Sequence, residues 1–300
     1  MDNKERIMKR MYAVLLIAVI ISVPCSMIRA WWWPGHRKTV QAAVDTLPEE
    51  MPVFFRKGCS ALALYSREPD MWTEIRPSSL RDAEKPEHYF DIELLKEKDI
   101  PLTREKFEVL CGELGILSST VGRLPYAIDE WYQRLKISFA EHRKWPGNEH
   151  IKAKTLYIAG ILSHYTADAC QPLHITIHYD GRVNNKGVSP HSGIHAKVDS
   201  MLGRIALKSD SNLKNLTSVS DSDIFGLIID TLKRSNSLVD RVYELEAKLP
   251  SAEASIHCTL ESEVEKFFRD RLYAAARFTA ILWYSAWVES KKVKIPEWYE

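Results

Sequence analysis

Two pairs of histidine and aspartate, each with four-residue spacing, carry the strongest chemical signal in the sequence. They are His164 with Asp168 and His195 with Asp199. Residues at this spacing share one face of an α-helix, so each pair would present an imidazole and a carboxylate together. A buried carboxylate is costly unless it is paired or bound to a metal, and zinc commonly takes both kinds of ligand. One such pair could be a simple buried ion pair, but two predict facing helices that contribute ligands to a polynuclear metal site.

Three further residues could join this site from outside those helices. His174 follows Pro172, which would end the helix and redirect the chain toward a second metal. Asp70 and His88 fall in segments that we expect to be loops. An aspartate that follows a proline is more often a turn or a helix cap, so neither residue is diagnostic alone.

The first thirty residues have the layout of a secretory signal peptide. Basic residues between Lys4 and Arg10 precede an apolar run over 12–23, and a short polar stretch ends at Ala30. Because a helix needs roughly 20 apolar residues to span a bilayer, we expect cleavage near Ala30 and a secreted or periplasmic protein. The alternatives are an uncleaved signal anchor, with tryptophans at the membrane interface, and lipidation at Cys25.

Cleavage after Ala30 would itself create a metal ligand. The new terminus would begin Trp-Trp-Trp-Pro-Gly-His, from Trp31 to His36. A free α-amino group has a pKa of about 7.7 to 8.0, so its neutral form is accessible and can chelate zinc together with the backbone carbonyl of the same residue. Trp31 and His36 are therefore candidate ligands.

The elements that must position these residues are predicted to be helices. Beyond residue 38 the apolar spacing is helical nearly everywhere, and the alternating runs typical of strands are missing. We therefore expect an all-α fold, with residues 31–300 in one compact multi-helix domain. The stretch over 267–287 is expected to pack into the core. The expected helices cover 39–66, 103–117, 118–140, 149–170, 193–207, 220–249 and 261–289.

Charge and cysteine content restrict the possible partners. The whole chain is formally +1 and residues 1–30 are +3, so the remainder is −2. That balance offers no broad basic field for tight binding of duplex DNA, and a nucleic acid would have to be held locally. Four cysteines remain after cleavage, and in an oxidising compartment they could form one or two disulfides. They are Cys59, Cys111, Cys170 and Cys258.

The ordered motifs from Trp31 to Asp199 resemble a superfamily of trinuclear zinc enzymes. It includes the bacterial phospholipases C and the single-strand-specific nucleases of fungi, plants and bacteria. The resemblance implies three zinc ions per chain. It assigns the first to Asp70, His88, His164 and Asp168, the second to His174, His195 and Asp199, and the third to the Trp31 amine and carbonyl, His36 and the shared Asp168.

The nuclease branch is the closer match. Its members are similar in the Gly-His pair that ends at His36, in the Gln-Pro-Leu-His sequence over 171–174, and in having aspartate in the second helical pair. The resemblance implies that Tyr89 stacks on a nucleobase and that Asp91 hydrogen-bonds it.

Two segments depart from the nuclease pattern. Thr73 stands where the nucleases usually carry a phosphate-clamping arginine, for which Arg67 or Arg76 could substitute. The Gly-Gly-Asn segment of the nucleases is replaced by Gly-Arg-Val-Asn-Asn over 181–185.

The sequence thus predicts a zinc-dependent hydrolase of phosphoric ester bonds, with single-stranded nucleic acid or a nucleotide as substrate. We expect a hydroxide that bridges the first and third zinc ions to attack phosphorus, with Asp70 orienting it, while the second zinc stabilises the leaving oxyanion. One alternative is a phospholipase C that hydrolyses phospholipid headgroups, and another is a noncatalytic zinc-stabilised secreted protein. No stable protein partner is implied, and a monomer is expected.

Overall fold

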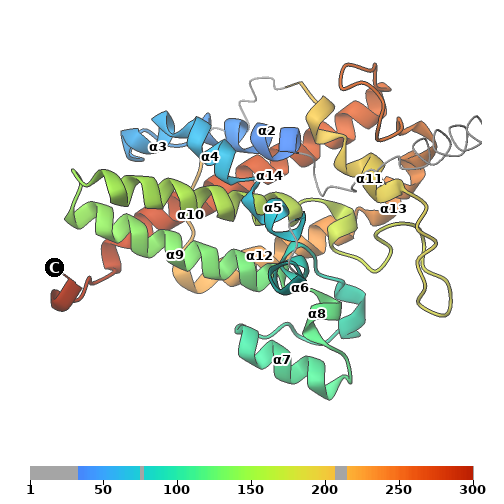
Figure 1. Ribbon diagram of the computed structural model, residues 1–300, viewed down its shortest axis with the longest axis horizontal. Coiled ribbons are helices and arrows are strands. Elements are labelled where there is room, and N and C mark those ends of the chain that lie inside the picture. The colour runs from blue at the N-terminus through green and yellow to red at the C-terminus, as the bar shows by residue number, and fades with distance from the viewer. Residues whose placement is uncertain (1–32, 75–77, 207–214, 300) are drawn as a thin grey trace, which may run out of the picture.

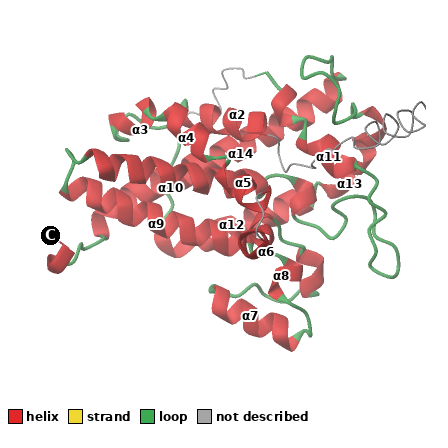
Figure 2. Cartoon of the chain, in the orientation of Figure 1, coloured by secondary structure: helices red, strands yellow, loops and turns green. Residues whose placement is uncertain are grey.

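The fold is all-α, as predicted. The computed structural model describes residues 33–74, 78–206 and 215–299, so the expected signal peptide, Trp31 and Arg76 lie outside the described residues. Within these ranges the elements are α- and 3-10 helices, without a β-strand (Figure 2). The described residues hold no helix with both the length and the apolar character needed to cross a membrane.

The helices differ greatly in length. The α-helices are α2 (Trp33–Val44), α3 (Val53–Lys57), α4 (Cys59–Tyr65), α5 (Glu68–Glu74), α6 (Ser78–Glu84), α7 (Arg104–Glu113), α8 (Ser118–Val121), α9 (Leu124–Lys144), α10 (Glu149–Asp168), α11 (Ile194–Asp199), α12 (Asp221–Asn236), α13 (Val239–Leu245) and α14 (Ser262–Glu289). The 3-10 helices are η1 (Lys85–His88), η2 (Ile92–Leu95), η3 (Pro172–His174), η4 (Leu202–Arg204), η6 (Glu246–Lys248), η7 (Ser290–Lys292) and η8 (Glu297–Tyr299).

Helix α10 is the central element, and it packs against α9, α14, α4 and α2 (Figure 1). Asn148 begins it by accepting hydrogen bonds from the backbone N–H groups of His150 and Ile151, at 2.9 and 3.2 Å. Every residue from Ala159 to Asp168 is buried. A helix that is surrounded by protein on all sides must bury any polar residue it carries. The C-terminal half of α10 therefore holds His164 and Asp168 inside the molecule.

Two apolar clusters meet where α10 ends. The larger cluster is built mainly from α2, α4, α9, α10, α12 and α14, and it includes Cys170 and Ile175. The smaller one joins α11, η4, α13 and the first half of α14, and it includes Leu173. The segment between Asp168 and Ile175 therefore crosses from one cluster to the other.

Several helices that the sequence predicts as continuous are divided. The predicted helix over 39–66 becomes α2, α3 and α4, because Pro48 and Pro52 cannot continue a helix. The predicted helix over 118–140 divides at Gly122, whose φ of 93° lies in the left-handed region. The helices expected over 193–207 and 220–249 are each divided into shorter pieces. Helix α14 matches its prediction closely, and its Trp283 is fully buried.

The four cysteines considered as disulfide partners are unpaired. Cys111 and Cys170 are buried, and Cys59 and Cys258 are partly exposed. Burial raises the pKa of the Cys170 thiol to about 12, so this residue is an unreactive part of the core.

Candidate metal centre

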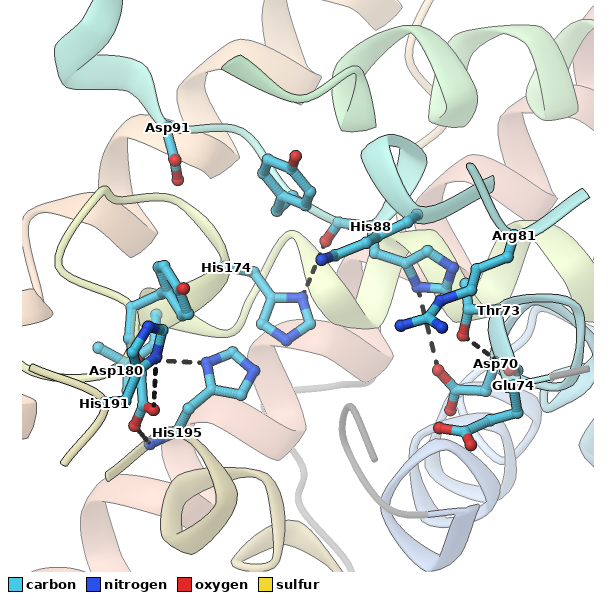
Figure 3. A pocket seen from close by; sticks show the side chains of 14 residues that line it. Asp70, Thr73, Glu74, Arg81, His88, Asp91, His174, Asp180, His191 and His195 are labelled. Atoms are coloured by element: carbon cyan, nitrogen blue, oxygen red, sulfur yellow. Dashed lines mark hydrogen bonds and ion pairs between the residues drawn. The ribbon is translucent and has the colours of Figure 1, made fainter. Parts of the chain in front are cut away.

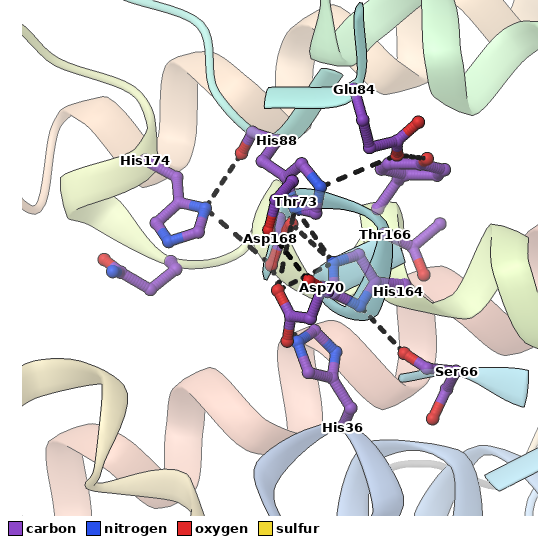
Figure 4. Close-up of polar contacts among 12 residues, drawn as sticks. His36, Ser66, Asp70, Thr73, Glu84, His88, His164, Thr166, Asp168 and His174 are labelled. Carbon is purple, nitrogen blue, oxygen red and sulfur yellow. Dashed lines mark hydrogen bonds and ion pairs between the residues drawn. The ribbon is translucent and has the colours of Figure 1, made fainter. Parts of the chain in front are cut away.

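Asp168 lies at the centre of a cluster of histidines (Figure 4). Its Oδ2 atom is 3.1 Å from His88 Nδ1 and 3.2 Å from His164 Nε2. Its Oδ1 atom is 3.7 Å from His36 Nε2 and also 3.7 Å from His174 Nδ1. The two carboxylate oxygens thus face different histidines, which is the arrangement required of a carboxylate shared between two metal ions.

The first group of candidate ligands consists of Asp70, His88 and His164. The Asp70 Oδ1 atom is 4.0 Å from His88 Nδ1 and 3.7 Å from His164 Nε2. The prediction that Asp70 and His88 lie in loops is wrong, since Asp70 is on α5 and His88 ends η1. Pro69 does not prevent the helix, because it occupies the first turn of α5, where a backbone N–H is not needed.

The second group consists of His174, His195 and Asp199. The Asp199 Oδ2 atom is 3.0 Å from His195 Nε2, and its Oδ1 atom is 3.8 Å from His174 Nε2. The two imidazole rings are stacked with their centroids 5.1 Å apart. Helix α11 and η3 therefore bring together the three residues that the resemblance assigns to one metal.

The third group consists of His36, His164 and Asp168. Helix α2 places the His36 ring on the ring of His164, with a centroid distance of 4.0 Å. Trp31, the other candidate ligand for this position, lies outside the described residues. The structure thus brings together the eight predicted side-chain ligands that it describes, in three adjoining groups.

Unpartnered polar atoms test whether metal ions fit these groups. Within the described residues, nine buried side-chain nitrogen or oxygen atoms have no hydrogen-bond partner, and six of them belong to the candidate ligands. Burying such atoms without a partner is unfavourable, and metal ions would satisfy those that face the ligand groups. His88 Nε2 is not one of these, because it lies 3.6 Å from Glu84 Oε1. The six atoms are Nδ1 and Nε2 of His36, Nε2 of His88, Oδ1 of Asp168, Nε2 of His174 and Oδ2 of Asp199.

Backbone carbonyls orient three of the imidazole rings. In each ring Nδ1 faces a carbonyl oxygen, which fixes the ring and leaves Nε2 to face the cluster. The pairs are His164 with Ser66 at 2.8 Å, His174 with His88 at 2.8 Å and His195 with Tyr179 at 3.3 Å. This pattern is typical of histidines that bind metals through Nε2.

The pKa shifts show that charge of both signs is concentrated here. Burial opposes the ionisation of Asp168, but the neighbouring rings of His164 and His174 hold the pKa of Asp168 well below its usual range. Burial also opposes the protonation of His88, but the carboxylates of Asp168 and Glu84 raise its pKa to about 10. Burial raises the pKa of Asp70 to about 6. Without a metal the cluster holds protons that metal binding would displace.

Three residues that the sequence analysis did not select support the ligands. The Nε2 group of Gln171 donates to Asp199 Oδ1 at 2.8 Å. Glu84 lies 3.6 Å from His88 Nε2 on the side away from Asp168, and the hydroxyl of Tyr165 donates to it. The first two had a sequence signal, because Gln171 precedes Pro172 in the noted motif and Glu84 lies one helical turn before His88. The third residue, Asp180, accepts a hydrogen bond at 2.8 Å from the backbone N–H that begins α11, and nothing in the sequence indicated this role.

A cavity of about 520 Å³ opens beside the candidate ligands (Figure 3). Its walls carry carboxylates, imidazoles, cations and two tyrosines, and one aliphatic side chain, that of Leu173. The residues that line it are Asp70, Thr73, Glu74, Arg81, Lys85, His88, Tyr89, Asp91, Leu173, His174, Tyr179, Asp180, His191 and His195.

Tyr89 and Asp91, the predicted nucleobase-binding residues, both line this cavity. The Tyr89 hydroxyl donates to the Ser119 carbonyl at 2.6 Å, which fixes the ring. Gly122 allows the chain to approach closely, because a Cβ atom there would lie 2.0 Å from the Tyr89 carbonyl oxygen. Burial, reinforced by nearby Glu93, raises the pKa of Asp91 to about 8. Asp91 is therefore largely neutral at pH 7 and can both donate and accept a hydrogen bond.

The cations that line the cavity differ from the two arginines that the sequence analysis offered as substitutes for the phosphate-clamping arginine. Arg67 is not among the lining residues, and Arg76 lies outside the part of the chain that the structure describes. Thr73 lines the cavity, but its hydroxyl donates to the Asp70 carbonyl at 2.8 Å. Arg81 and Lys85 line it instead. A signal for both existed, because they lie seven and three residues before His88, on the same helical face.

Comparison with known proteins gives little direction. No protein-family model matches the sequence. Over 204 residues the chain is 26% identical to a protein of Bradyrhizobium tropiciagri that is described as a probable serine protease. The match covers 58% of this chain and 25% of that protein, so the chain spans about a quarter of its relative's length.

Proposed function

We propose that this chain is a zinc-dependent phosphodiesterase that cleaves single-stranded nucleic acid or nucleotides, within the superfamily of trinuclear zinc nucleases and phospholipases C. The observation that carries the proposal is the set of eight side chains that form three adjoining groups beside one open cavity. Imidazole nitrogens and carboxylate oxygens, three or four to a site, are ligands that zinc accepts. The amine of Trp31 would complete the group that contains His36.

The placement of Asp70 supports a catalytic role. Bound zinc ions would polarise the phosphoryl oxygens and lower the pKa of a water molecule to about 7. Asp70 lines the cavity and also faces His88 and His164, so its carboxylate can orient an attacking water and hold its proton. Asp168 is fully buried and would act by holding two ligand groups at a fixed separation.

The cavity lining favours a nucleotide over a lipid. A phospholipase C that works at a lipid surface should have an apolar rim, whereas every residue that lines this cavity except Leu173 carries a polar or charged group. Tyr89 offers a fixed aromatic ring for stacking on a base, a contact worth about 1–3 kcal/mol. Asp91, in its neutral form, can pair with a base edge that presents one donor and one acceptor.

The printed name of the distant relative suggests a different hydrolase chemistry. A serine protease needs a serine hydroxyl within hydrogen-bond reach of a basic group, usually a histidine. In the described residues, the histidine rings that form hydrogen bonds do so with carboxylates, other histidines and backbone groups, and none with a serine or cysteine side chain. Metal-dependent hydrolysis therefore fits the described residues better.

A parallel assay tests the proposal. The protein that begins at Trp31 is loaded with zinc and offered single-stranded DNA, RNA, 3′-nucleotides and phosphatidylcholine vesicles. We expect hydrolysis of the nucleic acids or nucleotides, its loss in a chelator and its recovery when zinc is added. Turnover of phosphatidylcholine alone would replace the proposal with the phospholipase alternative. A protein that carries three zinc ions and cleaves none of these substrates would support the noncatalytic alternative.

A further inference from the structure

Two cations project from one helical face toward the cavity. Arg81 on α6 and Lys85 at the start of η1 are four residues apart, and both line the cavity. Figure 3 shows the guanidinium group of Arg81 turned toward the part of the cavity that holds Asp70 and Thr73. Arg81 therefore lies beside the first ligand group, and Lys85 lines the same cavity.

Two acidic residues of α6 and η1, Glu87 and Glu84, are engaged elsewhere. Both carboxylate oxygens of Glu87 accept hydrogen bonds from Arg104, each at 2.7 Å. Glu84 accepts a hydrogen bond from Tyr165 and lies beside His88. The remaining acid of these two elements, Asp82, is exposed and forms no ion pair with Arg81 or Lys85 in the described residues.

The side chains of Arg81 and Lys85 have no ion pair or hydrogen bond with any residue that the structure describes. Two like charges at this helical spacing repel each other, which destabilises a helix by a few tenths of a kcal/mol. A phosphate bound between them would remove the repulsion. Thr73, the nearby polar residue on α5, already uses its hydroxyl proton within its own helix.

We propose that Arg81 and Lys85 bind the non-bridging oxygens of the substrate's phosphate beside the metal ligands. Arg81 suits a bidentate contact because its guanidinium is planar and presents parallel donors, whereas Lys85 adds a single mobile charge. The inference rests on the proposed function, and it names the residues that would make the candidate site selective for phosphate anions. The two residues act on substrate binding and hold no metal.

The test compares Arg81→Gln and Lys85→Gln with the matched control Lys266→Gln, which removes one positive charge from the exposed surface of α14. The binding of inorganic phosphate to each zinc-loaded protein is measured by calorimetry, together with zinc content and the kinetics on a single-stranded oligonucleotide. We expect Arg81→Gln to weaken phosphate binding about 10-fold or more, as for the loss of a charge-assisted hydrogen bond, and to raise KM similarly. Lys85→Gln should have a smaller effect in the same direction, and zinc content should not change.

Unchanged phosphate affinity in Arg81→Gln at full zinc occupancy would overturn the inference while leaving the proposed function standing. Equal losses in all three variants would also overturn it, because they would indicate a general charge effect. If the wild-type protein hydrolyses none of the phosphoesters, the proposed function fails. The phosphate titration still decides the role of Arg81 in that case, because it needs no turnover.

Discussion

Asp168 is the side chain that links the candidate ligand groups. Its two oxygens face histidines from different elements, at 3.1 and 3.2 Å on one side and 3.7 Å on the other. An amide in its place keeps the shape but loses the charge, and one of its two terminal atoms becomes a donor that faces the imidazoles of the candidate ligands. The residue should therefore tolerate even a conservative change poorly.

Replacement of Asp168 by Asn should remove metal from two groups at once and lower activity about 100-fold or more. Metal analysis and the rate on a single-stranded oligonucleotide measure the two effects. The matched control is Asp230→Asn, at an exposed position on α12 remote from the candidate ligands, which should retain both zinc and rate. Near-normal zinc content and rate in Asp168→Asn would contradict the assignment of a shared ligand.

Asp91, which is not a candidate metal ligand, should make the free energy of unfolding depend on pH. Its pKa is about 8 in the folded protein and 3.8 when unfolded, so the folded state holds a proton that the unfolded state releases between these values. The contribution of the Asp91 proton to the stability of the folded state is therefore complete below pH 4, and it is lost as the pH rises toward 8. Relative to Asp91→Asn, the wild-type protein should lose at most about 1.4 kcal/mol per pH unit over this interval.

Denaturant unfolding of both proteins in the same metal state, repeated from pH 4 to 9, measures this difference. Any pH dependence of metal binding is common to both proteins and cancels. A constant difference across the range would show that Asp91 is ionised in the folded protein. Asp91 would then act only as an acceptor toward a base.

Part of the site could be predicted from residue types and spacing. His164 with Asp168 and His195 with Asp199 follow from helical periodicity alone, and the structure places each pair on a helix. Arg81 had only the weak signal of lying seven residues before His88, which does not distinguish it from other exposed arginines. Its position became informative when the structure placed it at the cavity.

Among the elements, α10 determines how precisely the candidate metal ligands are positioned. It carries two candidate ligands, and it approaches α4 closely because residue 160 has no side chain. A Cβ atom at Gly160 would lie 2.5 Å from the Cβ atom of Tyr65 and 2.9 Å from the Leu62 carbonyl oxygen. The Ser66 carbonyl that orients His164 directly follows this contact.

Gly160→Ala should therefore destabilise the protein by about 1–3 kcal/mol and also weaken metal binding, because α10 must move away from α4. Denaturant unfolding and zinc titration report the two effects. Gly112→Ala on α7 is the matched control, since nothing lies within 4 Å of its Cβ position. That change should be neutral or stabilising by up to about 1 kcal/mol. The same response in both variants would contradict close packing at Gly160.

The longest helices were predictable because their apolar spacing repeats over several turns, as in α10 and α14. The short helices that carry Asp70 and His88 were not, because a helix of four to seven residues contains too few turns to show a period. Both of these helices pack onto α10 and onto α6, which lies between them in the chain. The sequence therefore indicated the residues of the first ligand group without the elements that hold them.

At the level of the whole molecule, the candidate centre lies where the two apolar clusters meet and where six separate helical elements converge. Candidate ligands come from α2, α5, η1, α10, η3 and α11. The folded chain is therefore required before any group is complete. The third group also depends on the chain terminus, if Trp31 provides an amine beside His36.

An extension before Trp31 should reduce activity strongly and lower the zinc content by about one ion. The extension converts the amine into an amide nitrogen, which cannot coordinate zinc, and His36 with Asp168 would be left to hold the third ion. Removal of the extension with a protease should restore both properties. Equal activity of the extended and trimmed proteins at equal zinc occupancy would contradict the terminal ligand, and it would favour the signal-anchor or lipoprotein interpretation.

Metal analysis of the purified protein that begins at Trp31 is the most direct measurement of the proposed centre. Three groups of ligands predict about three zinc ions per chain in the active protein, and His195→Ala, which damages only the group with His174 and Asp199, should retain about two. Active protein that contains one zinc ion or fewer would contradict the trinuclear centre.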